Sequence, residues 1–345
     1  MPKNTEHTGM AAVVLESLGI GYFLGRDRVK ELVSNISVRL DQGDMVCLLG
    51  SNGSGKSTLI RTICGLQPKL GGKIFIEGKQ LKGWNKNLAQ QVGVVLTDII
   101  HGGNLTVYDV VSMGRYPHIN WMGTLSNEDH EMIMESIVLV GLPEFSNRRF
   151  DSLSDGEKQR VMIAKALAQD TRVIMLDEPT AHLDISNRVE IVNLLATLAH
   201  QKQKAILLSI HDLELALRMA DRIWLLQNKK LFTGAPEDLI LSGLVADTFK
   251  GKAFYFDSPS GTFRINRKKM HHVYFDNSSL QGLWTRYALE RIGCVISENR
   301  DEKIKLNYEN NIWELKYEGE LSKFKSIETL TKCLRAMFEK KKNNE

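Results

Sequence analysis

The fold of this chain is decided by one stretch of sequence, Gly50-Ser51-Asn52-Gly53-Ser54-Gly55-Lys56-Ser57. The stretch fits the pattern G-x-x-x-x-G-K-[ST], and it lies between an apolar run at residues 45–49 and a predicted helix at residues 58–64. Glycines at these positions allow backbone N–H groups to wrap around phosphates, and the start of the following helix faces the anion. The stretch therefore predicts a loop that binds the phosphates of ATP.

Two side chains of this phosphate loop have predicted chemical roles. Lys56 is expected to neutralise the β- and γ-phosphates, and the hydroxyl of Ser57 is expected to ligate Mg²⁺. The other loop residues, together with Thr58 at the start of the helix, are candidate nucleotide contacts. The alternative is a flexible glycine-rich loop without a ligand. The complete motif between a strand and a helix argues against that alternative.

Short apolar runs alternate with stretches of helical pattern around the loop. The predicted buried strands are residues 45–49, 92–96, 173–176, 205–209 and 223–227. Most of these strands are continuous apolar runs, and helices separate them. Such strands form mostly parallel sheets that are covered on both faces. The predicted fold class is therefore α/β.

The strand pattern stops between about Gly103 and Asp151. Two segments there, beginning at Thr106 and Ser126, fit the Ser/Thr-x-x-acid start of a helix. Gly141 then stands where the end of a helix belongs. We therefore predict a helical subdomain, at about residues 99–169, inserted into the α/β domain.

A different pattern begins after residue 252. Apolar and polar residues alternate at Val273 and Phe275 and again between Ile304 and Tyr317, with a turn at Asn310-Asn311. This alternation predicts an antiparallel hairpin, flanked by helices at residues 280–292 and 327–338. The predicted organisation is a disordered segment at residues 1–10, the α/β domain at 11–252 and a small C-terminal α+β domain at 253–345.

Composition and targeting features narrow the class of protein. The net charge of +4 is too small and too diffuse to indicate nucleic-acid binding by itself. The first ten residues are polar, and no apolar run approaches the roughly 20 residues that span a bilayer. The cysteines form no C-x-x-C pair and predict neither a metal site nor a disulfide framework. If the protein works on a membrane, we expect other chains to supply the spanning helices.

Two carboxylates follow the predicted strand at residues 173–176. Asp177, at the strand tip, is expected to hold the Mg²⁺ shell, and Glu178 is expected to polarise the attacking water as a general base. An acidic pair at a strand end is by itself typical of a solvated loop. This pair follows the phosphate-loop lysine by 177 − 56 = 121 residues. The presence of that loop favours the catalytic interpretation.

The segment Leu153-Ser154-Asp155-Gly156-Glu157 decides the family. Ser154 can cap the following helix, with Glu157 at the reciprocal capping position, and the start of the helix then faces an anion. A capped helix without a ligand is the alternative. The segment resembles the L-S-G-G-Q signature of ATP-binding cassettes and departs from it at Asp155 and Glu157. The resemblance implies that Ser154 and Gly156 contact ATP bound by a second copy of the chain.

Three further positions match the cassette family in order, within a resemblance that covers about residues 13–251. Asp184 ends a segment that resembles the loop coupling the two ATP sites. His211 stands in the position of the histidine that reaches the γ-phosphate, and Tyr22 matches the aromatic residue that stacks on adenine. A lone histidine or tyrosine is more often structural, so these roles depend on the resemblance.

One family position departs from the pattern. Cassettes usually place a glutamine after the strand at residues 92–96, where it contacts Mg²⁺ and the transporter. Thr97-Asp98 stands there in this chain. An alignment without a gap selects Thr97, which would act on Mg²⁺ through a water, whereas a shift of one residue selects Asp98. Both interpretations stay open.

The segments at residues 104–118 and 205–226 resemble the uptake family for iron-siderophores, haem and cobalamin. The resemblance implies a Mg-ATP-dependent ATPase that works as a homodimer of cassettes on the cytoplasmic face of the inner (plasma) membrane. It also implies partner permease subunits in the membrane and, through them, a substrate-binding protein. The alternative is a non-transport cassette that acts on nucleic acid or ribosomes. We expect no nucleic-acid partner, because the chain has no coiled-coil insertion, zinc module or second cassette.

Overall fold

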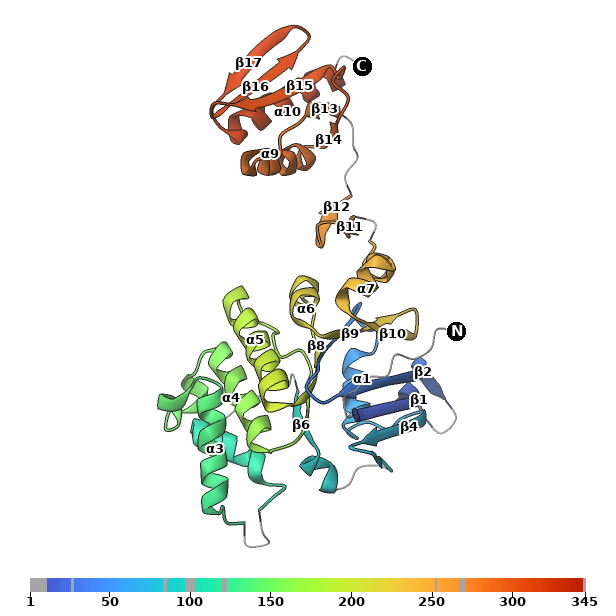
Figure 1. Ribbon diagram of the computed structural model, residues 1–345, viewed down its shortest axis with the longest axis vertical. Coiled ribbons are helices and arrows are strands. Elements are labelled where there is room, and N and C mark those ends of the chain that lie inside the picture. The colour runs from blue at the N-terminus through green and yellow to red at the C-terminus, as the bar shows by residue number, and fades with distance from the viewer. Residues whose placement is uncertain are drawn as a thin grey trace. The chain divides into compact units, whose positions relative to one another are not determined.

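The computed structural model describes residues 11–25, 28–82, 86–96, 103–119, 123–251, 253–266 and 271–343. The chain divides into two compact units, each described by itself below (Figure 1). The first unit contains residues 1–250 and 256–263, and the second contains residues 251–255 and 264–345. The short strands β11 (Phe254–Asp257) and β12 (Thr262–Ile265) pair with each other and contribute residues to both units.

A six-stranded sheet forms the centre of the first unit, in the order β10-β9-β3-β8-β7-β6. Its strands are β3 (Met45–Gly50), β6 (Val92–Val95), β7 (Val173–Leu176), β8 (Ala205–Ser209), β9 (Arg222–Gln227) and β10 (Lys230–Gly234). All neighbouring strands are parallel except β9 and β10. The predicted mostly parallel sheet is confirmed, and every residue of β3, β7 and β8 is buried.

Alternate residues of the central strands belong to two different cores. In β3, Met45 and Cys47 pack into one hydrophobic cluster, while Val46 and Leu48 pack into the other. Successive side chains of a strand point to opposite faces, so a strand covered on both sides must be apolar throughout. The helices on the first side are α5 (Ile185–Lys202), α6 (Leu213–Met219), α7 (Pro236–Leu241) and α8 (Leu244–Thr248), and α1 (Lys56–Ile63) lies on the second.

A second, antiparallel sheet of the first unit was not predicted from the sequence. It contains β1 (Ala11–Phe23), β2 (Val29–Asp41), β4 (Gly71–Ile76) and β5 (Lys79–Gln80), in the order β2-β1-β4-β5. Residues of β1, β2 and β4 share a core with Leu59 and Ile63 of α1. Irregular pairing interrupts β1 around Ser17, which has a φ of 47°. Such bulges break the two-residue alternation that marks a strand in sequence.

The helical subdomain contains α2 (Val107–Ser112), α3 (Asn127–Leu139) and α4 (Asp155–Ala168). Both predicted capping boxes are present, at Thr106 and Ser126, and Gly141 follows α3 with a φ of 76°. A largely buried ion pair joins the turn at Met113–Arg115 to α3, because Arg115 Nε lies 2.7 Å from Asp129 Oδ1. Short 3-10 turns complete the subdomain at Met113–Arg115, Pro143–Phe145 and Phe150–Ser152, and a further 3-10 turn at Lys86–Gln90 precedes β6.

The second unit is a five-stranded sheet with two helices. Its strands are β13 (His271–Phe275), β14 (Cys294–Ser297), β15 (Ile304–Glu309), β16 (Ile312–Tyr317) and β17 (Glu320–Phe324), in the order β14-β13-β15-β16-β17. The helices α9 (Leu280–Arg291) and α10 (Ile327–Asn343) contribute Leu289, Leu330 and Leu334 to its core.

The predicted antiparallel hairpin of the second unit is confirmed for β15 and β16. The alternating run at Val273 and Phe275 behaves differently, because β13 pairs in parallel with both β14 and β15. A parallel neighbour requires a crossover, and α9 supplies it between β13 and β14.

Within the described residues, no helix combines the length and the apolar character that crossing a bilayer requires.

Candidate functional site

The phosphate loop follows β3, the third strand in the order of the central sheet. Gly50, Gly53 and Gly55 have φ values of 155°, 75° and 105°, a region that residues with a side chain rarely adopt. A Cβ on Gly50 would lie 2.6 Å from the hydroxyl of Ser54 and 2.9 Å from the carbonyl oxygen of Leu226. Both backbone conformation and close packing therefore require glycine at the start of the loop.

Lys56 closes the loop at its far end. Its Nζ donates a hydrogen bond to the carbonyl oxygen of Gly50 at 3.0 Å, and the side chain is buried. Burial lowers the pKa of Lys56, whereas the charges of Glu178 and Asp177 oppose that shift. The ammonium group is thus held inside the loop, close to two carboxylates that stabilise its charge.

Asp177 follows β7 and is 1% exposed. Its Oδ1 accepts hydrogen bonds from the hydroxyls of Ser57 at 3.0 Å and Ser209 at 2.8 Å. Its Oδ2 is buried and has no hydrogen-bond partner. Because β3, β8 and β7 are parallel neighbours, their carboxyl ends bring the loop, Ser209 and Asp177 to one edge of the sheet.

Glu178 is held by its backbone and by a histidine. Its N–H donates to the hydroxyl of Ser209 at 2.8 Å, and its φ of 52° is unusual for a residue with a side chain. Oε1 of Glu178 lies 2.7 Å from Nε2 of His211, which follows β8. The histidine fixes the direction of the carboxylate, and the carboxylate can accept a proton from a bound water.

Ser209 belongs to a segment that the sequence singled out for His211, but its own role was not predicted. One hydroxyl donates to Asp177 and accepts from the N–H of Glu178. The side chain is completely buried. A polar residue at the end of an apolar strand is the signal that could have found it.

The signature segment begins α4. Ser154 accepts from the N–H of Glu157 at 3.3 Å, and the N–H of Ser154 donates to Glu157 Oε2 at 2.8 Å, so the predicted capping box is present. That backbone hydrogen bond is the main reason why the pKa of Glu157 is lowered. Asp155, the departure from the family signature, is exposed in the first turn.

Gly156 and Asp184 meet at a residue that the sequence did not predict, Asn187. Asp184 caps α5 by accepting from the N–H of Asn187 at 2.8 Å, and the side-chain amide of Asn187 donates to Asp184 Oδ2 at 3.2 Å. A Cβ on Gly156 would lie 2.7 Å from Oδ1 of Asn187. The side chain of Asn187 therefore packs against Gly156 while it holds Asp184.

Tyr22 lies at the end of β1 and is 44% exposed. Its hydroxyl is 2.8 Å from the hydroxyl of Thr58 in α1, so the ring lies beside the helix that follows the phosphate loop. The remaining predicted residue, Thr97, and its alternative, Asp98, lie outside the described residues.

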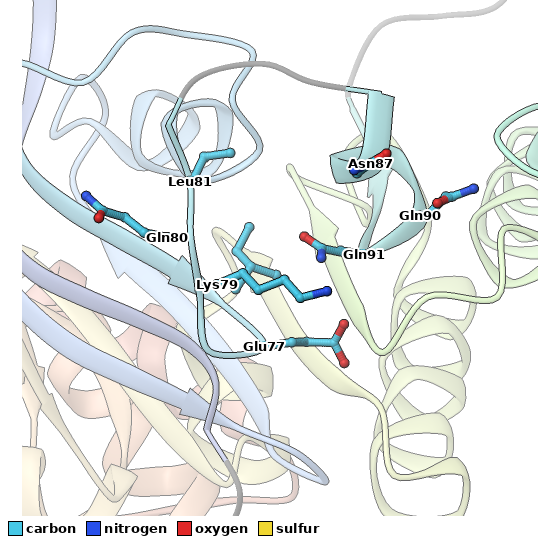
Figure 2. A pocket seen from close by; sticks show the side chains of 8 residues that line it. Glu77, Lys79, Gln80, Leu81, Asn87, Gln90 and Gln91 are labelled. Atoms are coloured by element: carbon cyan, nitrogen blue, oxygen red, sulfur yellow. The ribbon is translucent and has the colours of Figure 1, made fainter.

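Two cavities lie beside the sheets of the first unit. One of about 320 Å³ is bordered by Ser51, Gly53 and Ser54 of the phosphate loop. The other, of about 530 Å³, lies between the β4–β5 turn and the turn at Lys86–Gln90, and Figure 2 shows the side chains around it. Its lining residues are Ile76, Glu77, Lys79, Gln80, Leu81, Asn87, Gln90 and Gln91, none of which is a predicted site residue.

Comparison with known proteins shows the family. Over 253 residues, 72% of this chain and 85% of the relative, the chain is 38% identical to an uncharacterized ABC transporter ATP-binding protein of Methanocaldococcus jannaschii. The chain belongs to the ABC transporter ATP-binding proteins. A family model described as ABC transporter matches residues 33–181 of this cassette protein. A second model, described as Iron ABC transporter C-terminal domain, matches residues 270–335.

Two named ABC relatives are transport proteins of bacteria. The chain is 35% identical to the probable siderophore transport system ATP-binding protein YusV of Bacillus subtilis, over 70% of this chain and 86% of the relative. It is 32% identical to the ferric enterobactin transport ATP-binding protein FepC of Escherichia coli, over 71% and 89%. ABC ATP-binding proteins are ATPases coupled to transport, and the predicted enzyme class is therefore confirmed.

A solved ABC structure matches the cassette part of the chain. It is the dimeric structure of MJ0796, a bacterial ABC transporter cassette, with a TM-score of 0.56 and 26% identity. The match covers 65% of this chain and 98% of that one. The predicted cassette fold is confirmed.

Proposed function

We propose that this ABC protein powers the import of an iron-siderophore, haem or cobalamin-type substrate through a permease that other chains form. One observation carries the proposal. The same chain combines a cassette related to siderophore transport proteins with a C-terminal segment that matches the Iron ABC transporter C-terminal domain.

The hydrogen bonds of the site support a division of roles in ATP hydrolysis. Backbone N–H groups of the phosphate loop and the ammonium of Lys56 would neutralise the phosphates. Glu178 would orient a water and accept its proton, and His211, which lies against Oε1 of Glu178, would keep the carboxylate in place. Tyr22 would stack on the adenine, because its ring is exposed beside α1.

The residues present fit a magnesium ion bound together with ATP. The unpartnered Oδ2 of Asp177 and the neighbouring hydroxyl of Ser57 are oxygen ligands of the kind that Mg²⁺ prefers. The described residues contain no group of three His, Cys, Asp or Glu that could hold a metal alone. The ion would therefore share the phosphate oxygens, where it neutralises negative charge. Thr97, through a water, remains our proposal for a further contact.

A pair of cassettes would complete each ATP site. Ser154, Gly156 and Asp184 would act on the nucleotide that the other copy binds, and Asn187 would hold the last two in register. The structure of the related dimer supports such a pairing. We further propose that the pair docks on the cytoplasmic side of the membrane, on permease subunits that receive their cargo from a substrate-binding protein.

The helical subdomain is the proposed contact with the permease, and Tyr116 is the residue with which to test it. Arg115 is unsuited, because its ion pair with Asp129 makes it structural, whereas Tyr116 is 58% exposed. In vesicles containing a candidate permease, Tyr116→Ala should keep basal ATPase activity and lose stimulation by the permease. Tyr255→Ala, at an exposed tyrosine of β11 outside the helical subdomain, is the matched control.

The function itself is tested by uptake of radioactive iron-siderophore into those vesicles. Wild-type protein should support ATP-dependent uptake, and Glu178→Gln should not. Absence of stimulation by any permease, together with tight and salt-sensitive binding to DNA or RNA, would instead support the non-transport alternative.

A further inference from the structure

Helix α9 of the second unit carries large apolar side chains on its outer face. We call Leu280, Leu283, Trp284 and Tyr287 the α9 stripe; these side chains are 67%, 44%, 58% and 38% exposed. Their spacing of three and four residues places them side by side along two turns of the helix. Trp284 and Tyr287 also pack edge to face, with ring centroids 5.6 Å apart.

The inner face of α9 is made mainly of small residues. Gly282, Thr285 and Ala288 are buried, and a Cβ on Gly282 would lie 2.3 Å from the carbonyl oxygen of Asn277. The indole N–H of Trp313 in β16 donates to the hydroxyl of Thr285 at 2.9 Å. These contacts fix the rotation of α9 on its sheet, so the α9 stripe cannot turn inward.

The neighbouring helix shows that an apolar outer face is not general in this domain. The exposed side of α10 carries Glu328 and Lys332, which form an ion pair at 2.6 Å. A helix that is apolar on opposite faces is typical of a buried helix. Unlike α10, α9 therefore has the composition of a helix that another surface covers.

We propose that the α9 stripe packs against the α9 stripe of a second copy of this chain. The stripe is self-complementary about a two-fold axis placed at its middle. In an antiparallel helix pair, Leu280 would lie opposite Tyr287, and Leu283 opposite Trp284, so that each aromatic ring meets a leucine. Contacts of this isologous kind are the commonest in soluble dimers.

The size of the stripe fits a contact between two copies that another interface already holds together. If each of the four side chains offers about 200 Å² when fully exposed, a value within the range for aromatic side chains, their exposed parts add up to roughly 400 Å² per copy. A freestanding dimer buries about 800 Å² per partner. The stripe is therefore too small to assemble alone, but it suffices between domains that a cassette dimer already holds at high effective concentration. In this respect the inference rests on the proposed cassette pairing.

Cross-linking of the full chain tests the contact directly. Leu283→Cys, treated with a short bismaleimide in the presence of Mg-ATP, should yield a covalent dimer. Lys316→Cys is the matched control, because Lys316 is exposed on β16 of the same domain. Unaltered protein is the second control, because Cys47, Cys64 and Cys294 are buried and Cys333 is half-buried. Equal cross-linking of the two cysteine variants would refute the proposal. The proposal would also be refuted if Leu283→Cys gave only monomer after treatment.

A charge in the stripe provides a second, equilibrium measurement. Trp284→Glu places two carboxylates at the contact, and the dissociation constant of the dimer, measured by sedimentation, should rise at least about tenfold, or 1.4 kcal/mol. Leu241→Glu, at a leucine that is 84% exposed in α7, should leave it unchanged. Circular dichroism shows whether both variants fold. An unchanged constant for folded Trp284→Glu overturns the α9 contact.

Failure of this contact and failure of the proposed function give different results. Protein that cross-links at Leu283→Cys but does not hydrolyse ATP keeps the contact and rejects the transport ATPase. Protein that hydrolyses ATP as a dimer but shows no cross-link rejects only the contact. A stripe that is protected from labelling in a monomer would indicate that the chain's own cassette covers it, and this result also refutes pairing between copies.

Discussion

Replacement of Ser209 by alanine should lower the rate of hydrolysis far more than the affinity for ATP. The hydroxyl donates to Asp177 Oδ1 and accepts from the N–H of Glu178, each at 2.8 Å. The variant loses both contacts and leaves a backbone N–H without a partner beside a carboxylate. It touches neither the phosphate loop nor the adenine side of the site.

The size of the effect follows from those contacts. A hydrogen bond to a charged group contributes about 1.5–3 kcal/mol, and an unsatisfied buried donor costs about 1–3 kcal/mol. Glu178 also sits at a φ of 52°, a conformation that costs about 1–3 kcal/mol and needs support from its surroundings. We expect a loss of unfolding free energy of about 3 kcal/mol. A misplaced Glu178 should lower kcat about 10- to 100-fold, with little change in KM.

The assay compares steady-state ATPase kinetics and melting temperature for three variants. Ser209→Thr keeps the hydroxyl and should recover most of the lost kcat, although its added methyl group costs about 1–3 kcal/mol of stability in a packed site. Ser136→Ala, at a buried serine of α3 that donates to the carbonyl oxygen of Met132, should leave kcat unchanged, with little change in stability because alanine favours a helix. A kcat for Ser209→Ala within twofold of wild type would refute the reasoning.

Three further predictions concern the catalytic base, the signature and acid stability. Glu178→Gln should still bind ATP but hydrolyse it too slowly to measure, so that an ATP-bound dimer accumulates in size-exclusion chromatography. Gly156→Ala should displace the amide of Asn187 by steric contact and lower the ATPase activity. Stability should stay nearly constant, because the helix preference of alanine, about 1 kcal/mol over glycine, offsets the steric cost. In the double variant, Asn187→Ala should restore part of the ATPase activity. The pKa of Asp129 is lowered to about 2, mainly by the backbone N–H of Ser126. The contribution of the Asp129 carboxylate to stability is therefore complete above its unfolded pKa of about 4 and disappears as the pH falls through about 2. Denaturant unfolding at several pH values should show that the unfolding free energies of wild type and Asp129→Asn converge in acid.

Sequence patterns predicted those elements whose signals are local. A strand covered on both faces is apolar along its length, so β3, β7 and β8 could be recognised without knowledge of their neighbours. The capping boxes at Thr106 and Ser126 depend on residues three apart and were equally visible. The strand β1 was missed because bulges interrupt its alternation.

By itself the sequence determined the family, and it predicted the phosphate loop and the residues that surround it, because each of these is a short motif of chemically required residue types. Only the tertiary structure decided which side chains hold those residues in place. Ser209 meets Asp177 and Glu178 because parallel strands end at one edge of a sheet, and Asn187 packs against Gly156 because α4 and α5 start side by side. The α9 stripe likewise became visible only when packing on the sheet assigned the small residues to the inner face. Such contacts join residues that are distant along the chain, and local patterns in the sequence do not predict them.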